Sequence, residues 1–283
     1  VAGSYYGQSY QILGGGRALA DAFEEALREA GVAMFTGHGA SAIHLNDAGA
    51  FESISLEDIN ESLTADACVF SGDPRLLLDL LPEKAFRPIY RKRLQGMRDT
   101  MSAFILFGVL PEQSAGFSGH LVLMKNVTPG MGSLDAPPHD RPVFITRSCA
   151  PHGRGGVSVI CPMRSMANGA WERLLADGGD DAYREWKEKT AASVRAGLEG
   201  QMPSGFTDFR LLDAATPRTF RRYCNSVAGA LYGAGHRMDD MPLLPRTRVP
   251  GLFLTGQHTL TVGVLGAVMS GYVTAEMLQA QIG

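Results

Sequence analysis

The chain has 283 residues, of which 45% are hydrophobic, and its 26 basic and 29 acidic side chains give a formal net charge of −3. This size suits one large or two ordinary globular domains, and the charge gives no reason to expect nucleic acid as a partner. Its four cysteines are widely spaced without a C-x-x-C pair, which argues against a disulfide framework or a zinc ribbon and favours a reducing, cytoplasmic setting.

The sequence carries no sign of export or of membrane insertion. It has no N-terminal signal pattern and no apolar run of about 18 residues, so we expect neither secretion nor a spanning helix. It starts at Val1 without methionine, which is typical of a processed or shortened polypeptide or of one half of a split enzyme. The basic stretch from Arg87 to Arg98 is typical of a solvated helix face, and peripheral membrane contact stays open there.

The first part of the chain predicts a helix, several short strands and two more helices. Apolar residues at helical spacing after the glycine turn Leu13–Gly16 predict a helix that ends at Gly31. Strand-like runs follow at Val32–Phe35, Ala40–Leu45, Ser53–Ile59 and Ala65–Phe70. Asp73 before Pro74 indicates a helix start, because Asp caps free N–H groups and proline has no N–H to lose. We expect helices through Leu81 and over the basic stretch.

The rest predicts an antiparallel sheet, further helices and a final strand, glycine loop and helix. Strand-like runs separated by Pro- and Gly-rich loops are Met101–Leu110, Leu121–Lys125, Val143–Ser148 and Val157–Cys161. Helical spacing marks Trp171–Leu175, Asp181–Leu198 and the segment after Thr216–Pro217, and Asp208–Leu212 is a short strand. The chain ends with the strand Leu252–Thr255, the loop Gly256–Gly266 and a helix to Gln281. The fold class is therefore α/β or α+β.

The loop Gly256–Gly266 is the strongest site signal. A strand that leads through glycines into a helix presents free backbone N–H groups and the positive end of the helix dipole to an anionic ligand. A face of small residues follows, which permits close approach of another backbone or of a flat ligand. Its members are Gly263, Gly266, Ala267, Ser270 and Thr274. The competing interpretation is a tightly packed helix that binds no ligand.

Other motifs are weaker or absent. Gly14–Gly16 before a helix is a second candidate anion site, although a simple connecting turn explains it as well. The sequence contains no G-x-G-x-x-G, P-loop, G-x-S-x-G or H-E-x-x-H motif. Cys149, His152 and Cys161 match no standard zinc spacing, so we expect no metal. His258 lies inside the glycine loop, where it could face a ligand or be an ordinary loop histidine.

Several segments carry a family resemblance when they are taken in order. They are Gly14–Ala22, Ala65–Pro74, Thr216–Tyr223 with Gly229–Gly233, and Val249–Gln257 with Gly263–Ala267. Together they resemble the phytoene desaturase, carotenoid isomerase and retinol saturase group of FAD-dependent enzymes, over nearly the whole chain. The last segment is similar to the group's C-terminal flavin-contact motif, and its Thr-Gly-Gln form leans toward the retinol saturase branch.

The resemblance implies a fold and a set of site residues. Segments 1–99 and 214–283 would form part of an FAD-binding, Rossmann-like domain, and 100–213 an antiparallel-sheet substrate domain. The predicted cofactor-binding residues are Gly256, Gln257, Gly263, Val264 and Gly266, with Asp73 close to the flavin and Gly15 and Gly16 at the first glycine turn. The predicted substrate-pocket residues are Phe104, Phe107, Tyr232 and His258. No side chain is assigned as a catalytic acid or base.

The resemblance also implies a function. It is that of an FAD-dependent oxidoreductase that desaturates, saturates or isomerises carbon–carbon bonds of a long apolar isoprenoid or polyene, such as a carotenoid or retinoid. The group's N-terminal strand, G-x-G-x-x-G and helix, which would hold the adenosine diphosphate part of FAD, are not in this sequence. We therefore expect either a separate polypeptide or a longer chain to supply them. The alternative is a non-catalytic subunit that binds an apolar ligand or a partner and has lost flavin.

Overall fold

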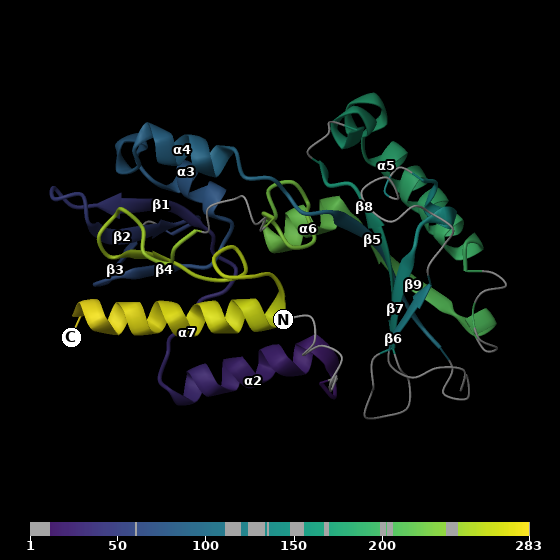
Figure 1. Cartoon of the computed structure of the whole chain (residues 1–283), viewed down its shortest axis with the longest axis horizontal. Helices are drawn as coiled ribbons and strands as arrows, with labels where there is room; N and C mark the ends of the chain where they lie inside the picture. Colours follow the sequence, from purple (N-terminus) through teal and green to yellow (C-terminus); the bar gives the residue numbers. More distant parts are fainter. Residues whose placement is uncertain are drawn as a thin grey trace. The chain divides into compact units, whose positions relative to one another are not determined.

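The computed structural model describes residues 12–59, 61–110, 120–123, 134, 136–147, 156–166, 170–198, 202, 206–235 and 243–282. The chain divides into two compact units (Figure 1). Unit 1 comprises Val1–Met34 and Ala103–Thr216, and unit 2 comprises Phe35–Ser102 and Pro217–Gly283. The chain passes from unit 2 to unit 1 after Ser102 and back to unit 2 after Thr216, close to the predicted limits of the substrate domain, 100–213. Residues 1–34, predicted to belong with the cofactor domain, group with unit 1 instead.

Unit 1 is built on a five-stranded sheet in the order β6-β7-β8-β5-β9. The strands are β5 (Ser102–Val109), β6 (His120–Leu123), β7 (Val143–Arg147), β8 (Gly156–Met163) and β9 (Arg210–Ala215). The pairs β6–β7, β7–β8 and β5–β9 are antiparallel, which confirms the predicted antiparallel sheet. Burial alternates along β8, as expected for a strand with one buried face.

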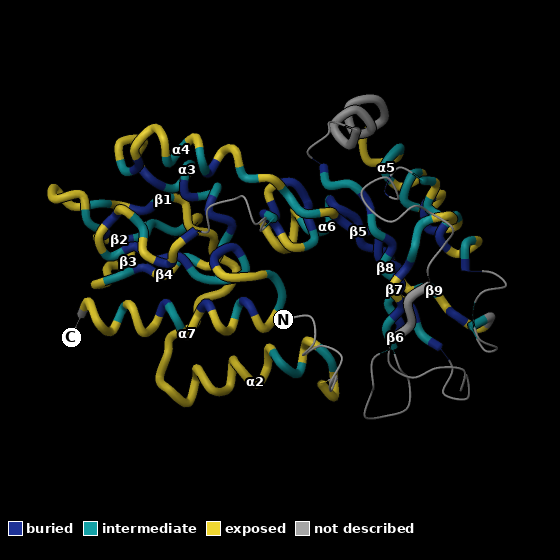
Figure 2. The backbone as a smooth tube through the Cα atoms, in the orientation of Figure 1, coloured by how far each residue is buried: buried dark blue, intermediate teal, exposed yellow. Residues whose placement is uncertain are grey.

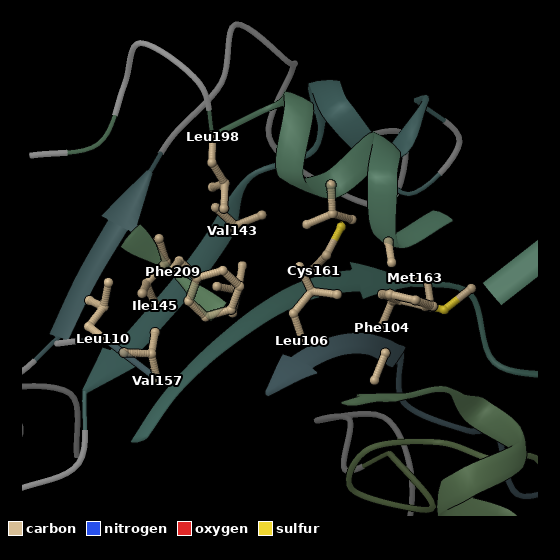
Figure 3. Close-up of a cluster of buried hydrophobic side chains, with 14 of the residues drawn as sticks. Phe104, Leu106, Leu110, Val143, Ile145, Val157, Cys161, Met163, Leu198 and Phe209 are labelled. Atoms are coloured by element: carbon tan, nitrogen blue, oxygen red, sulfur yellow. The ribbon is translucent and has the colours of Figure 1, made fainter. Parts of the chain in front are cut away.

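Helix α5 (Ala170–Ala196) contributes to the core of unit 1. Gly179 has non-helical backbone angles inside it (φ 60°, ψ −145°), so the two helical stretches predicted from the sequence are two segments joined at a glycine. Val194 of the second segment joins a buried cluster with Phe104 and Ile145, and Figure 3 shows labelled side chains of this cluster gathered over the sheet. The Trp186 ring meets the Phe104 ring edge-on, with centroids 5.7 Å apart.

Unit 1 also contains helix α2 (Gly15–Glu29) and two short 3-10 turns, η4 (Pro138–Asp140) and η6 (Phe206–Asp208). Helix α2 confirms the first predicted helix, and none of its residues is buried. Val32–Phe35, predicted as a strand, is instead irregular and exposed. The prediction was wrong because an apolar run forms a strand only where another strand pairs with it.

Unit 2 contains two small sheets and several helices. Strands β1 (Ala40–Leu45), β2 (Phe51–Leu56) and β3 (Ser62–Thr64) form one sheet, and β4 (Cys68–Phe70) pairs with β10 (Leu252–Leu254) in the other. Its helices are η1 (Pro74–Leu76), α3 (Leu77–Leu80), η2 (Glu83–Ala85), α4 (Pro88–Gln95), α6 (Pro217–Cys224) and α7 (Gly263–Ile282). Helices α3 and α4 lie on one side of these strands and α7 on the other (Figure 1).

The core of unit 2 joins both of its chain segments. Leu77 and Leu94 from the helices pack with Phe51, Leu252 and Leu254 from the strands, and all are nearly inaccessible to solvent. Strand β3 was not predicted, because its three residues are all exposed and carry no burial period. In the described part of the chain, no helix is long and apolar enough to cross a membrane.

The pairing of β4 with β10 positions the candidate site. The two strands are parallel, with Leu254 opposite Phe70, so their carboxyl ends lie at the same edge. The backbone N–H of Thr255 continues the pairing and donates to the Phe70 carbonyl at 3.0 Å. Loops that follow parallel strands at one edge are where α/β folds place ligands. The loop after β4 and the glycine loop after β10 therefore meet.

Candidate functional site

The glycine loop lies directly against the loop that follows β4. Gly256 has a φ of +87°, a backbone conformation that side chains disfavour. A Cβ at this position would lie 3.0 Å from the Ser71 carbonyl oxygen. Gly256 therefore permits both the turn out of β10 and the close contact between the two loops.

A second glycine turn starts helix α7. Gly263 also has a φ of +87°, and a Cβ built on it would meet no atom within 4 Å. Three residues later, a Cβ on the buried Gly266 would collide with the Thr261 carbonyl. The first turn of a helix has backbone N–H groups without partners inside the helix and a positive dipole end. The open side at Gly263 leaves room for a ligand group there.

The small-residue face of α7 packs on β10 and the glycine loop. The Ser270 hydroxyl lies 3.0 Å from the Thr255 hydroxyl and 2.5 Å from the Thr259 hydroxyl. The Thr274 hydroxyl donates to the Leu254 carbonyl at 3.0 Å. Ser270 and Thr274 are buried, so the small residues serve close approach to another backbone along most of the helix. The open side at Gly263 leaves room for a ligand near its N-terminal end.

A buried ion triad lies under the loop that follows β4. The Arg75 guanidinium donates to Asp73 twice, from Nε at 3.0 Å and from Nη2 at 2.6 Å, and Nη2 also donates to Asp99 at 2.6 Å. The side chain of Arg75 is 11% exposed, that of Asp73 is 2% exposed and that of Asp99 is 8% exposed. Asp73 also accepts from the Arg75 backbone N–H, which confirms it as the predicted cap of the helix that begins at Pro74.

The triad determines the charge of this region. Burial alone would raise the pKa of Asp73, but the hydrogen bonds and charge of Arg75, with a smaller effect of His258, hold that pKa below its ordinary value. Burial works against the charge of Arg75, but Asp73 and Asp99 outweigh it and raise the pKa of the guanidinium. The Asp73 carboxyl and the Arg75 guanidinium are therefore both ionised at neutral pH.

The imidazole of His258 packs against the backbone around Gly233. Asp99 forms an isolated bridge with Ala234, and the Thr100 N–H and hydroxyl both donate to the Gly233 carbonyl, at 2.8 and 3.0 Å. Gly233 has a φ of +66°, and a Cβ on it would collide with the His258 ring. His258 is 6% exposed. The absence of a side chain at Gly233 therefore makes the space in which the imidazole lies.

The structure brings together part of the predicted site. Gly256, Gln257, Gly263, Val264, Gly266, Asp73, Tyr232 and His258 all belong to unit 2. Gln257 is half-buried, whereas Val264 is exposed, so Val264 can offer a ligand its backbone N–H. Tyr232 is 41% exposed, and its N–H is held by the Thr100 hydroxyl at 3.2 Å.

The remaining predicted residues belong to unit 1. Gly15 and Gly16 lie at the start of α2, and Gly15 has a φ of +70°. Phe104 is buried in the core against Trp186, and Phe107, three residues further along β5, is 41% exposed. Residues three apart on a strand point to opposite faces, so Phe104 and Phe107 do not line one pocket together. Of the residues considered for metal, Cys149 and His152 lie outside the described part of the chain.

Some residues of the site were not predicted. Arg75 carried a weak signal, since it directly follows the Asp-Pro helix start. Asp99 carried none, because 24 residues separate it from Arg75 and it directly follows the basic stretch that indicated a solvated helix. The hydroxyl contacts of Thr255 and Thr259 depend on how α7 packs, which no local pattern reveals.

The geometry fits one end of a flavin cofactor. The start of α7 is open at Gly263, and the loop that leads into α7 contacts the loop after β4 at Gly256. The N–H groups at the start of α7 suit a negatively charged or carbonyl-bearing part of the cofactor. The residues able to hold it are those of the turn, Gly256, Gln257 and Gly263, together with the backbone of Val264. The adenosine diphosphate end needs a phosphate-binding motif that the sequence does not contain.

Solved structures share this fold. The chain is similar to an oxidoreductase from Methanosarcina mazei, with 15% identity and a TM-score of 0.61 over 93% of this chain and 55% of that one. It is also similar to a putrescine oxidase whose cofactor binding was redesigned, with 14% identity and a TM-score of 0.62 over 95% of this chain and 53% of that one. The chain thus spans slightly more than half the length of these structures.

Sequence comparison identifies the family. No curated protein matches the chain. The family model described as flavin containing amine oxidoreductase matches residues 2–278, which includes every residue of the glycine loop and of the ion triad. The match covers nearly the whole chain, and the start of α7 suits a flavin. The chain belongs to the family of flavin containing amine oxidoreductases.

Proposed function

We propose that this chain forms the part of an FAD-dependent oxidoreductase that holds the flavin ring and the substrate. The observation that carries the proposal is the unit formed by β10, the glycine loop and α7, within a flavin family match that covers residues 2–278. FAD, when bound, supplies a hydride acceptor or donor. The chain contributes the backbone N–H groups of the α7 start, held in place by the hydroxyl contacts of Ser270 and by the contact of Gly256 with Ser71.

As the substrate class we propose a long apolar isoprenoid or polyene, altered at a carbon–carbon bond. The Thr255–Gln257 segment supports this choice through its resemblance to the retinol saturase branch. The ion triad supports it on physical grounds, because Asp73 and Asp99 both pair with Arg75. In the described part of the site, both of these carboxylates are already paired with Arg75, so neither is a free partner for a cationic amine.

The reaction follows from this choice of substrate. With FAD bound, desaturation would remove a hydride and a proton from neighbouring carbons of the substrate as the carbon–carbon double bond forms, the hydride going to the cofactor and the proton to solvent. Saturation would be the reverse. Isomerisation would use reduced flavin and would leave the oxidation state of the substrate unchanged. Tyr232 and His258 are the candidate pocket residues in unit 2, Phe107 is the exposed candidate in unit 1, and no side chain is assigned as a proton donor or acceptor.

Anaerobic mixing of the flavin-loaded protein with a substrate tests this class. We expect a carotenoid or retinoid in detergent micelles to bleach the visible absorption of the oxidised flavin, with a product that has lost two hydrogen atoms by mass spectrometry. If the enzyme instead saturates polyenes, the photoreduced flavin should regain its colour when the polyene is added. Bleaching by putrescine, with no response to polyenes in either direction, would show that the substrate is an amine.

We also propose that a dinucleotide-binding segment covers the exposed side of α7. Helix α7 presents large apolar side chains to solvent and is largely exposed in Figure 2. They are Val264, Leu265, Val268, Met269 and Tyr272, each between 48% and 64% exposed. A contiguous apolar surface of this kind marks an interaction site.

The occupant follows from the sequence and from the related structures. Those structures continue for roughly as many residues again as this chain contains, and the chain lacks the G-x-G-x-x-G motif that FAD requires. A segment that carries this motif, in the same polypeptide or in a separate one, would cover α7 and complete the FAD site. A reducing, cytoplasmic setting with at most peripheral membrane contact is part of the same proposal. The test is to purify the chain with and without that segment, and we expect flavin to be retained only when the segment is present.

A further inference from the structure

An open cavity on the surface of unit 2 is lined by residues outside the glycine loop. It has a volume of about 1120 Å³ and is formed by η2, α4 and Arg248. Arg248 lies in the turn that leads into β10, where the Thr247 hydroxyl donates to the carbonyls of Val249 and Leu252 at 3.1 and 2.8 Å. This turn precedes β10, whereas Gly256 follows it. The cavity and the flavin site are therefore at opposite ends of the strand.

The walls of the cavity are strongly cationic. Lys84, Arg87, Arg91 and Arg248 line it, against a single carboxylate from Glu83. None of the four cations forms an ion pair with a residue in the described ranges, whereas Arg75, Arg184 and Lys187 all do. Four like charges gathered around one carboxylate repel one another, and an anionic ligand relieves that repulsion.

The cavity is supported by a fixed wall. Phe86 is 3% exposed in the core of unit 2, and its ring lies 4.9 Å from that of Tyr90. The Arg91 guanidinium donates to the Glu83 carbonyl at 3.5 Å, and both residues line the cavity. The backbone that carries the cations is therefore held by the core.

Size and side-chain type select the ligand. Three of the four cations are arginines, whose planar guanidinium groups bind phosphate oxygens in pairs. The volume of this cavity lies above the usual range of about 300–1000 Å³ for ligand sites. The cavity therefore has room for much more than a lone phosphate ion. We propose that this cavity binds a phosphorylated organic ligand through Arg91, Arg248 and their cationic neighbours. The phosphate can belong to a free metabolite or to a lipid headgroup, and the site goes beyond the proposed function at the glycine loop.

Calorimetric titration of the full chain with inorganic pyrophosphate tests the site. We expect saturable binding of one pyrophosphate, and an affinity about tenfold weaker or worse in the double variant Arg91→Ala/Arg248→Ala. The matched control is Lys92→Ala/Arg246→Ala, which removes the same charge from the same helix and turn at positions that do not line the cavity. Its affinity should change by less than about twofold. Circular dichroism verifies that both variants fold.

A second titration distinguishes the two sources of phosphate. Vesicles of phosphatidylglycerol are compared with vesicles of phosphatidylcholine in a flotation assay. Binding to phosphatidylglycerol vesicles that is lost in Arg91→Ala/Arg248→Ala and kept in the control identifies a lipid headgroup, and pyrophosphate binding alone identifies a free ligand. The proposal is overturned if neither probe binds, or if both double variants weaken binding equally. Neither readout depends on flavin, so failure here leaves the proposed oxidoreductase function untouched.

Discussion

Replacing Arg75 with methionine should lower the free energy of unfolding by about 3–5 kcal/mol at neutral pH, the usual cost of breaking a buried ion pair from one side. The methionine fills similar volume but leaves Asp73 and Asp99 without their counter-charge, and both carboxylates are almost fully buried. Two buried carboxylates would then face each other across an apolar side chain. Urea denaturation followed by circular dichroism measures the change.

The effect of Arg75→Met should depend on pH in a definite direction. In the native protein the pKa of Asp73 is lowered, so its pairing stabilises the fold above the unfolded value of about 3.9 and is lost as pH falls through the lower, folded value. Without Arg75, burial raises the pKa of the same carboxyl above its unfolded value. The penalty in the variant is then full at neutral pH and shrinks as pH falls, so the stability gap between the two proteins narrows in acid.

A matched variant checks this explanation. Arg184→Met removes an exposed ion pair with Asp181, in which both side chains are mostly in water, and such pairs contribute little. We expect almost no change in unfolding for that variant. A loss in Arg75→Met no greater than in Arg184→Met, or a gap that stays constant with pH, would mean that the triad does not stabilise the fold as described.

Two glycines of the same helix should respond to alanine in opposite directions. Gly266→Ala should lower the free energy of unfolding by about 3 kcal/mol, because the new methyl group collides with the Thr261 carbonyl and the loop must move. Gly271→Ala should raise it by about 0.5–1 kcal/mol, since its Cβ meets no atom within 4 Å and alanine favours a helix. Urea denaturation of both variants measures this contrast. Destabilisation by both substitutions would show that α7 does not pack as described.

Local patterns predicted much of the fold. Strand β1 has the bounds that the apolar run indicated, Ala40–Leu45, and proline at the first position marked both the helix after Asp73 and helix α6. Each feature depends on residues close together in the sequence. Local patterns failed where the structure of a segment depends on a partner distant in sequence. Examples are the exposed strand β3, and Val32–Phe35, which pairs with no strand among the described residues.

The candidate site was likewise predicted only in part. The resemblance grouped Gly256, Gly263 and Asp73, and the parallel pairing of β4 with β10 brings the two loops that carry them together. No pattern predicted Asp99 as the second partner of Arg75, because the contact depends on how a distant segment folds back. The resemblance placed Phe104 in a substrate pocket, but the face of β5 that packs against Trp186 depends on the whole sheet.

The central claim is that the start of α7 holds a flavin. The most direct measurement is the visible absorbance spectrum of the purified chain together with a segment that carries G-x-G-x-x-G, with the chain alone and the Gly266→Ala variant as comparisons. We predict a bound flavin in equal molar amount to the chain, retained with the segment, weak or absent without it, and lost in Gly266→Ala but not in Gly271→Ala. A colourless complex, or a flavin retained equally in Gly266→Ala, would contradict the assignment of the glycine loop as the flavin site.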